Sequence, residues 1–376
     1  MPDGRNANIL TIRPIHGAIP VRLDFKPATK KTKTMTRSSA GKARGTGRTT
    51  LEEVAVLAGV STMTASRALS QPQLVSEGTR TRVEQAVVQL GYVPNRAARA
   101  LASSQSRVIA VLVPSLSNAV FSELLDGIHD AIEASQYQLL IGNTLYSEAE
   151  EEKLLGIYMQ SNPDGILLSN LNHSEAVERT LAGSRVPIVS MMDLADDTAR
   201  MSVGFSQDAA GMAMTEHLLG RGYRRIAFIA AQLDERTLRR ADGYREAMRA
   251  AGLFDARLEL MVPERSTIAL GAELTRQVLE RIPDCDAVFC CNDDLAYGAV
   301  FHCQRQGIAI PRQLAVAGFN DLSASAWMVP SLTTVETPRY RIGFESASLL
   351  LQAIEGRAPA QRRIDLGFTL RAREST

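Results

Sequence analysis

Hydroxyl, thioether and guanidinium side chains follow one another closely between residues 62 and 67. In a helix that enters the major groove of DNA, Thr62, Met63 and Ser66 would face the base edges. Arg67 would reach a base or a phosphate, because its paired donors fit a guanine edge and its charge fits a phosphate. The methyl groups of threonine and methionine fit the methyl group of thymine. This stretch therefore predicts base-specific contacts with double-stranded DNA.

Further hydroxyl groups lie on either side of this stretch, where they could fix DNA phosphates. Phosphate contacts hold a protein in register on the duplex, although they carry no sequence information. The predicted phosphate-binding set comprises Thr50, Ser61, Thr64, Ser70, Ser76 and Thr79, and Tyr92 completes the predicted DNA-binding residues of this region.

Three short helices are needed to present these side chains, and the apolar spacing predicts them. The first spans about residues 51–58, Gly59 supplies the turn, and Ser61 caps a second helix over residues 62–69. A third helix runs from about Glu77 to Leu90 with Ser76 as its cap. The apolar positions that would form the small core are Leu51, Val54, Ala55, Ala58, Val83, Ala86, Val87 and Leu90. This arrangement is typical of a helix-turn-helix, and the alternative of an ordinary helical hairpin leaves the next segment unexplained.

The next segment, residues 95–102, is rich in Ala and Arg and predicts a short hinge helix. Fewer than about ten residues do not form a stable isolated helix in water, so this helix needs a partner. Asn95, Ala98 and Leu101 share one side of it. That spacing favours pairing with a symmetry mate on DNA over the alternative of a plain interdomain linker.

The net charge of +1 hides an uneven division of charge along the chain. Residues 1–106 carry 16 Lys and Arg against 6 Asp and Glu, a net +10, and the remaining residues carry 26 against 35, a net −9. A basic module joined to an acidic body is typical of a DNA-binding domain attached to a domain with another task. Residues 1–48 lack a sustained apolar period and are expected to form a disordered tail. Met35 is predicted as an alternative start of the protein.

From residue 107 onward, apolar runs of strand length alternate with segments of helical spacing. The expected strands are 108–113, 138–141, 165–168, 187–191 and 203–205, then 226–230, 259–262, 287–291 and 314–317. This alternation predicts two series of parallel strands flanked by helices. A ligand would bind beyond the carboxyl ends of the strands, in the cleft between the two halves.

These motifs occur together and in order in one protein family. The LacI/GalR family of bacterial repressors has a headpiece and hinge that resemble TLEEVAVLAGVSTMTASRAL and VSEGTRTRVEQAVVQLGYVPNRAARALAS. Its core resembles VIAVLVPSLSNAVFSELLDGI, CNDDLAYGA and VAGFNDLSASAWMVPSLTTVETP, so the resemblance extends from about residue 49 to the C-terminus. Within that family, residues 233–237 and the ending LGFTLRAREST look most like the gluconate-utilisation repressors.

The resemblance implies an N-terminal all-α helix-turn-helix headpiece (residues 49–94) and a hinge helix or linker (95–106). Residues 107–376 would form an α/β periplasmic-binding-protein-like core of two doubly wound parallel-sheet subdomains with three crossings between them. We expect an N-subdomain of about 107–206 plus 320–335, and a C-subdomain of about 207–319 plus 336–376. A homodimer on a pseudo-palindromic operator is also implied, with Leu101 wedged into the minor groove.

The effector-binding residues are likewise carried over from the resemblance. They are Ser115, Val120, Phe121, Asp193, Arg236, Arg240, Ser266, Asn292 and Asn320. Val120 stands where purine-responsive members carry an aromatic residue, which argues against stacking on a base. Arg236, Arg239 and Arg240 supply more positive charge than a neutral sugar needs, and arginine suits a carboxylate. We therefore expect a sugar acid such as gluconate or 2-ketogluconate; the alternative is a surface arginine cluster that never meets ligand.

The expected function is that of a sequence-specific transcriptional repressor of sugar-acid metabolism genes, released from its operator when effector fills the cleft. Within the family, the alternatives are a response to a neutral sugar and a repressor that depends on a corepressor. A sugar-binding transport protein would explain the core but would have no use for residues 50–104. An enzyme would need a reactive constellation, whereas the five histidines are scattered, so no catalytic residues are expected.

The remaining composition points to a cytoplasmic protein. The four cysteines form no C-x-x-C pair and have no matched histidine spacing, so neither a metal site nor a cofactor is expected. Reduced, buried thiols fit that interpretation. No window approaches eighteen uninterrupted apolar residues, and the start lacks the pattern of a secretory signal, so no membrane association is expected.

Overall fold

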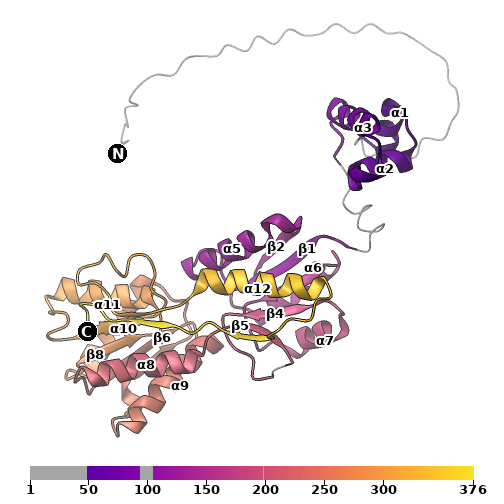
Figure 1. Ribbon diagram of the computed structural model, residues 1–376. Coiled ribbons are helices and arrows are strands. Elements are labelled where there is room, and N and C mark those ends of the chain that lie inside the picture. Colours follow the sequence, from indigo (N-terminus) through magenta and orange to yellow (C-terminus); the bar gives the residue numbers. More distant parts are fainter. Residues whose placement is uncertain (1–48, 94–104, 198) are drawn as a thin grey trace, which may run out of the picture. The chain divides into compact units, whose positions relative to one another are not determined.

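The computed structural model describes residues 49–93, 105–197 and 199–376. They belong to two compact units, a headpiece that ends at Val93 and a core that runs to Thr376 (Figure 1). The expected tail (residues 1–48) and the expected hinge helix (95–102) lie outside the described residues.

The three helices expected in the headpiece are confirmed. α1 (Leu51–Ala58) and α2 (Thr62–Ser70) are followed by a 3₁₀ turn (Pro72–Leu74) and α3 (Glu77–Leu90). Thr50 and Glu53 form a capping box: each side chain accepts a hydrogen bond from the other residue's amide, at 3.3 and 2.9 Å. Gly59 adopts a left-handed φ of 67°, which ends α1 and turns the chain toward α2.

The headpiece core is small and built from short side chains. Its fully packed members are Val54, Ala55, Ala58, Ala65, Ala68, Val83 and Ala86, as the apolar spacing of the three helices requires. Ser76 does occupy the N-cap of α3, but its hydroxyl donates to Thr79 Oγ1 at 3.0 Å and caps no backbone amide.

The N-subdomain of the core is built on a six-stranded parallel sheet. In spatial order its strands are β11 (Arg363–Asp365), β5 (Met201–Gly204), β4 (Ile188–Met191), β3 (Gly165–Leu168), β1 (Val108–Val113) and β2 (Gln138–Asn143). Its helices are α5 (Ala119–Ile132), α6 (Glu148–Met159), α7 (Glu175–Gly183) and α12 (Arg339–Ile354), and a 3₁₀ turn (Glu133–Ser135) follows α5. Alternate residues of β1 pack on opposite faces, so both faces of the sheet are buried, as in other parallel sheets.

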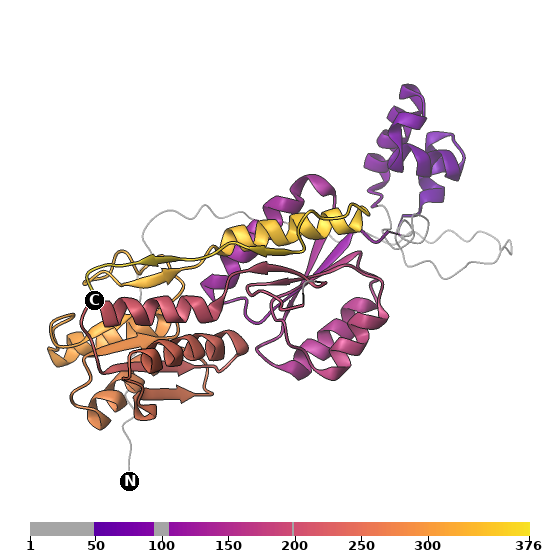
Figure 2. The same ribbon diagram turned by 60° about the horizontal axis from the view of Figure 1, so that its bottom comes forward.

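The C-subdomain is built on a four-stranded parallel sheet. Its strands are β7 (Glu259–Val262), β6 (Ile226–Ala231), β8 (Ala287–Cys290) and β9 (Ala315–Ala317), in that spatial order. Its helices are α8 (Gln207–Gly220), α9 (Glu235–Ala250), α10 (Ile268–Arg281) and α11 (Asp293–Gln306), with a 3₁₀ turn (Ala256–Leu258) before β7. An antiparallel pair, β10 (Thr334–Glu336) and β12 (Thr369–Arg371), runs beside it. Figure 2 shows the C-terminal segment, in yellow, leading from α12 in one lobe to the C-terminus in the other.

The expected division of the C-terminal third between the subdomains was wrong. The segment 320–335, expected in the N-subdomain, is held in the C-subdomain, where Ser325 bonds to Asp293 and Thr333 forms a bridge with Ala317. The segment 336–376, expected in the C-subdomain, is split instead: α12 packs along α5, β11 pairs with β5, and only the end returns. The chain still crosses three times, after β5, after β10 and after β11.

Pairs of glycines let the helices of each subdomain approach closely. A Cβ on Gly127 of α5 would lie 2.1 Å from a backbone oxygen of α12, and one on Gly343 of α12 would lie 2.0 Å from a backbone oxygen of α5. The same reciprocal arrangement joins α8 to α9 through Gly211 and Gly243. A side chain at these positions would push the helices apart. The α8–α9 contact fixes the helix that carries Arg240.

Candidate DNA-reading surface and effector cavity

The side chains predicted to read bases lie on the exposed face of α2. Thr62, Met63, Ser66 and Arg67 are all exposed, and Met63 keeps 70% of its surface. The opposite face of the helix, Ala65 and Ala68, is buried in the headpiece core. Among the described residues, no hydrogen bond or ion pair occupies the side chains of the four exposed residues. They are therefore available to an external partner.

The hydroxyl groups predicted to bind phosphate already have partners inside the headpiece. Ser61 accepts the Thr64 amide at 3.1 Å and also bonds the Thr64 hydroxyl, which caps α2. Thr50 caps α1, Ser70 donates to a carbonyl one turn earlier, and Ser76 and Thr79 bond each other. These bonds give every member of the set a local role, and their phosphate contacts stay a prediction. Tyr92 is half-buried against the headpiece core.

The basic charge expected of a DNA-binding head is carried largely outside the helical domain. Residues 49–93 hold three arginines and four glutamates, whereas residues 1–48 hold eleven Lys and Arg against two Asp.

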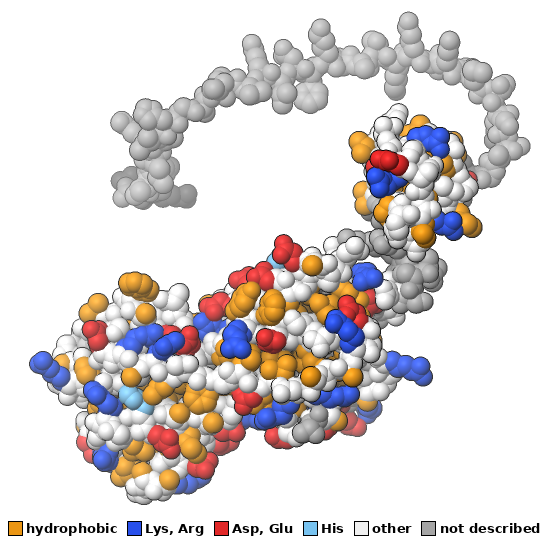
Figure 3. Space-filling model, viewed as in Figure 1, with side chains coloured by type: hydrophobic (Ala, Val, Ile, Leu, Met, Phe, Trp, Pro, Cys, Tyr) orange, Lys and Arg blue, Asp and Glu red, His pale blue; other side chains and the backbone are white. Residues whose placement is uncertain are grey.

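Asn95, Ala98 and Leu101 lie outside the described residues, so the predicted hinge contacts are not placed. Figure 3 shows charges of both signs interspersed on the visible face of the core, so the net −9 of the later residues forms no single acidic surface there.

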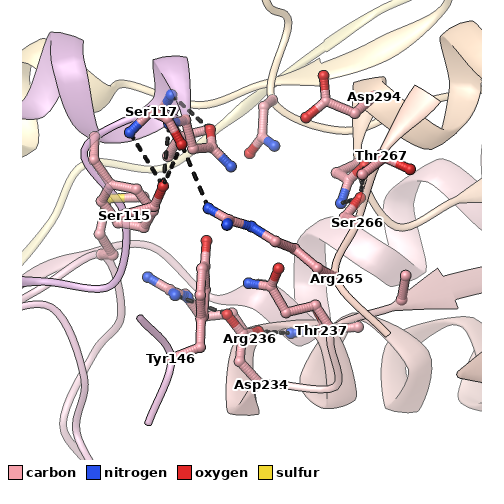
Figure 4. A pocket seen from close by; sticks show the side chains of 18 of the residues that line it. Ser115, Ser117, Tyr146, Asp234, Arg236, Thr237, Arg265, Ser266, Thr267 and Asp294 are labelled. Carbon is pink, nitrogen blue, oxygen red and sulfur yellow. Dashed lines mark hydrogen bonds and ion pairs between the residues drawn. The ribbon is translucent and has the colours of Figure 1, made fainter. Parts of the chain in front are cut away.

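A cavity of about 360 Å³ lies between the two subdomains, at the carboxyl ends of their strands (Figure 4). Eight of the nine predicted effector residues line it: Ser115, Val120, Phe121, Arg236, Arg240, Ser266, Asn292 and Asn320. The ninth, Asp193, does not line it. Asp193 accepts the Leu194 amide and lies 3.5 Å from Arg239, and burial raises its pKa to about 6.

Sequence reasoning missed more than half of the cavity wall. The additional lining residues are Ser117, Asn118, Tyr146, Met192, Ala231, Gln232, Asp234, Thr237, Arg265, Thr267 and Asp294. Several directly precede or follow predicted residues at the same strand ends, and that proximity is the signal that could have found them. Tyr146 has no such neighbour, because it follows β2, a strand from which no site residue was predicted.

Four helices begin at the cavity, and the residue that caps each one lines its wall. Asn118 accepts the Val120 amide to cap α5, and Asp234 accepts the Thr237 amide to cap α9. Thr267 and Asn292 cap α10 and α11 in the same way. Helix N-termini carry partial positive charge and unpaired amides, so together they favour an anion in the enclosed space.

Arg240 is the most unusual charged group in this wall. Its side chain is 6% exposed; Nε donates to Gln207 at 2.8 Å, and Nη1 donates to the Cys291 carbonyl at 2.7 Å. The guanidinium also lies 3.8 Å from the centre of the Phe319 ring. In the described part of the chain, no carboxylate contacts it. Burial therefore lowers the pKa of Arg240 to about 10. A bound anion would stabilise the charged guanidinium and raise this pKa again.

The other two arginines of the wall are already engaged. Arg236 pairs with Asp234 at 2.8 Å. Although burial opposes its charge, that carboxylate raises the pKa of Arg236. Arg265 reaches from the C-subdomain to Ser117 of the N-subdomain, with 3.4 Å between Nη2 and Oγ, as Figure 4 shows. With Asp234 and Asp294 as the acidic members, the wall carries three arginines against two carboxyl groups.

Two further expectations concern absent features. Among residues 49–93, 105–197 and 199–376, no group of three or more His, Cys, Asp or Glu side chains is placed to hold a metal ion. Within those same ranges, every helix is too short or too polar to cross a membrane.

A helix-turn-helix headpiece joined to a two-lobed core with a polar cleft defines a ligand-responsive DNA-binding regulator. Known families match both parts: "bacterial regulatory proteins, lacI family" matches residues 50–95, and "periplasmic binding protein-like domain" matches residues 215–376. The HTH-type transcriptional regulator GntR of Pseudomonas aeruginosa is 49% identical over 333 residues, which cover 89% of this chain and 97% of that protein. The chain therefore belongs to the lacI family of bacterial regulatory proteins, and it is a DNA-binding transcriptional regulator, as expected.

Solved structures agree with this assignment. The transcription regulator GntR from Chromobacterium violaceum is 53% identical with a TM-score of 0.70, covering 71% of this chain and 98% of that chain. The lac repressor dimer bound to operator and the anti-inducer ONPF is 26% identical with a TM-score of 0.78, covering 88% and 99%. The fold expected from the sequence, a helix-turn-helix unit followed by an α/β core with parallel sheets, is confirmed.

Proposed function

We propose that this regulator represses genes of sugar-acid metabolism and leaves its operator when a sugar acid such as gluconate or 2-ketogluconate fills the cavity. One observation carries the ligand class: Arg240 is buried in the cavity wall, and no carboxylate of the described residues contacts it. A buried guanidinium binds a carboxylate with paired, charge-assisted hydrogen bonds, and a neutral sugar offers no such group. The four helix N-termini support the same choice of an anion.

The rest of the wall suits the hydroxyl groups of a sugar chain. Ser266 and Asn292 bond each other at 2.9 Å between Asn292 Nδ2 and Ser266 Oγ, and both face the cavity with Asn320 and Gln232. The volume of about 360 Å³ is within the range of small-molecule sites. Phe121 and Tyr146 also line the cavity, but Val120 stands where purine-responsive members carry an aromatic residue, which supports a sugar acid over a purine base.

The regulator would act on DNA as a homodimer. A pseudo-palindromic operator needs two heads related by a two-fold axis, and the similarity to the lac repressor dimer on its operator supports that assembly. The exposed face of α2 would supply the base contacts in each head. Because its partner is chromosomal DNA, its place of action would be the cytoplasm.

The test is a titration of the protein–operator complex at fixed salt, using an operator selected by the purified protein from random duplexes. Gluconate, 2-ketogluconate and 6-phosphogluconate are compared with neutral glucose, because salt alone changes DNA affinity steeply. Release by one acid but not by glucose is the expected result. Release by glucose alone would overturn the ligand class, and tighter binding with any acid would make the ligand a corepressor.

A further inference from the structure

Arg339, the first residue of α12, lies where the chain crosses back from the C-subdomain to the N-subdomain. Its side chain is 6% exposed, and all three guanidinium nitrogens donate hydrogen bonds. Nε and Nη2 donate to the two carboxylate oxygens of Glu123 at 3.0 and 2.9 Å. Nη1 donates to the Asn320 carbonyl and the Thr337 hydroxyl, and Nη2 also reaches the Asp321 carbonyl at 3.3 Å. One buried side chain thus fastens both subdomains together.

One C-subdomain partner of Arg339, Asn320, also belongs to the wall of the effector cavity. Asn320 lines the cavity, and its carbonyl accepts a hydrogen bond from Arg339. Asn320 and Asp321 have positive φ angles of 114° and 52°, which residues other than glycine seldom adopt. The Asp321 carboxylate is held in turn by Arg373 at 2.7 and 3.0 Å. A shift of Asn320 is therefore passed to Arg339 through the backbone of a single residue.

The N-subdomain partner of Arg339 leads to the opposite wall of the same cavity. Glu123 lies on α5, one turn after Val120, and the first turn of α5 contributes Val120 and Phe121 to the cavity wall. The Glu123 side chain is 45% exposed, so the Arg339–Glu123 ion pair lies at the edge of the contact between the subdomains. The guanidinium of Arg339 consequently joins α5, whose first turn lines one wall, to Asn320, which lines the other.

We propose that Arg339 is a positioning residue that couples occupancy of the cavity to the arrangement of the two subdomains. This inference rests on the proposed function for the ligand, but its geometry does not depend on which acid binds. Because Arg339 bonds Glu123 with paired donors and caps two carbonyls at once, the subdomains cannot slide past each other gradually. The two subdomains must exchange one set of bonds for another. The crossing between the subdomains is therefore a two-state element. A ligand that moves Asn320 relative to α5 selects between the two states.

The first test measures coupling, defined as the ratio of operator Kd with and without saturating effector. Arg339→Lys keeps the positive charge but loses the paired donors of the guanidinium. Glu123→Gln keeps the shape of the side chain but loses its negative charge. Both should lower the ratio by about fivefold or more, and the double variant should lower it little further, because the two residues act as one unit. Arg341→Lys, an exposed arginine two residues along the same helix, is the matched control. A wild-type ratio in both variants, even with a lowered Tm, would reduce Arg339 to a structural ion pair and overturn the proposal.

The second test needs no effector. Nitroxide labels at Gln160→Cys and Arg281→Cys, one exposed position in each subdomain, report the spread of distances between the subdomains by pulsed electron resonance. In ligand-free protein, Arg339→Lys and Glu123→Gln should broaden the distribution, and Arg341→Lys should leave it unchanged. A distribution like that of the wild type in both variants overturns the inference. If no acid releases the wild-type operator complex, the proposed function fails, and the distance measurement still decides the role of Arg339.

Discussion

One arginine of the candidate DNA-reading surface and one arginine of the candidate effector cavity differ sharply in their surroundings. Arg67 is exposed on α2 and contacts no carboxylate among the described residues, whereas Arg240 is 6% exposed and held by Gln207 and Cys291. A hydrated guanidinium without fixed partners, such as that of Arg67, can change its orientation to bind a base or a phosphate. The guanidinium of Arg240 is already desolvated and oriented, so it can bind only a ligand whose acceptor groups match that orientation. Its contribution to selectivity is therefore larger.

The comparison predicts its largest effect at Arg240. Replacing Arg240 by Ala removes the charge-assisted bonds to the carboxylate, which contribute about 1.5–3 kcal/mol each. The concentration of acid that releases the operator should rise by about 100-fold or more, measured by fluorescence anisotropy of labelled DNA. Operator affinity without ligand should stay the same.

Arg239 supplies the control for that variant. It lies on the same helix, one residue earlier, pairs with Glu235 at 2.8 Å and does not line the cavity. Arg239→Ala should therefore respond to the acid almost as the wild type does. If both variants respond alike, Arg240 has no special role in reading the carboxylate.

Arg67→Ala should give the next largest effect, confined to DNA. A good base contact by arginine contributes about 1–3 kcal/mol of discrimination, so affinity for the selected operator should fall by about 10- to 100-fold. Calorimetric affinity for the acid should not change. Arg80→Ala, which removes an arginine 3.6 Å from Glu84 on α3, should weaken DNA binding less. Equal losses from the two substitutions would show that Arg67 supplies charge alone.

The buried carboxyl of Asp293 makes the stability of the core depend on pH. Burial raises its pKa from 3.8 to about 6, although Leu322, Ser325 and Thr334 donate to it. Between pH 4 and 6 the folded state keeps a proton on Asp293 that the unfolded state releases, so the contribution of Asp293 to stability is fully present below pH 4 and is lost as pH rises through 6. The expected loss in the free energy of unfolding is about 1–3 kcal/mol.

Denaturant unfolding of the core at several pH values measures this loss. Asp293→Asn should be less stable at every pH but should show a shallower decline between pH 4 and 6. Asp193, whose pKa is also about 6 through burial, contributes in the same direction, so a residual slope is expected. A slope equal to that of the wild type would exclude Asp293 as its source.

The smallest effect is expected at the cap of α1. Thr50→Ala removes the side chain that accepts the Glu53 amide, and loss of such a cap costs about 1 kcal/mol. Hydrogen exchange of the α1 amides should quicken accordingly, with no change in the core. Thr62→Ala, which removes an exposed hydroxyl that caps nothing, should leave exchange unaltered. Slower or unchanged exchange in Thr50→Ala would mean that the capping box adds nothing to the headpiece.

The sequence predicted the headpiece better than the cavity because headpiece signals are local. A cap at Ser61, a turn at Gly59 and apolar spacing over α1 and α3 are each set by residues a few positions apart. The strands of the core were also recognisable as apolar runs. β10, β11 and β12 were not: β11 and β12 have no fully buried position, and β10 has one apolar residue among its three.

The cavity wall depends on contacts that no local pattern reveals. Arg265 becomes a wall residue because it reaches Ser117, 148 positions earlier in the chain. Asp193 follows a strand that ends near the cavity, yet its carboxylate turns to the Leu194 amide and toward Arg239. The division of the C-terminal third went wrong for the same reason. α12 belongs with α5 through close backbone contacts at Gly127 and Gly343, and a sequence read in order does not show which helix these glycines face.

The most direct test of the central claim, that Arg240 reads a carboxylate, compares two ligands that differ in that group alone. Gluconate and glucitol share six carbons and their chain hydroxyls, and calorimetry can measure the affinity of each for the wild type and for Arg240→Ala. The account predicts that the wild type binds gluconate about 100-fold or more tightly than glucitol, and that the difference disappears in the variant. Equal affinities in the wild type, or a preference for gluconate that survives in Arg240→Ala, would contradict it.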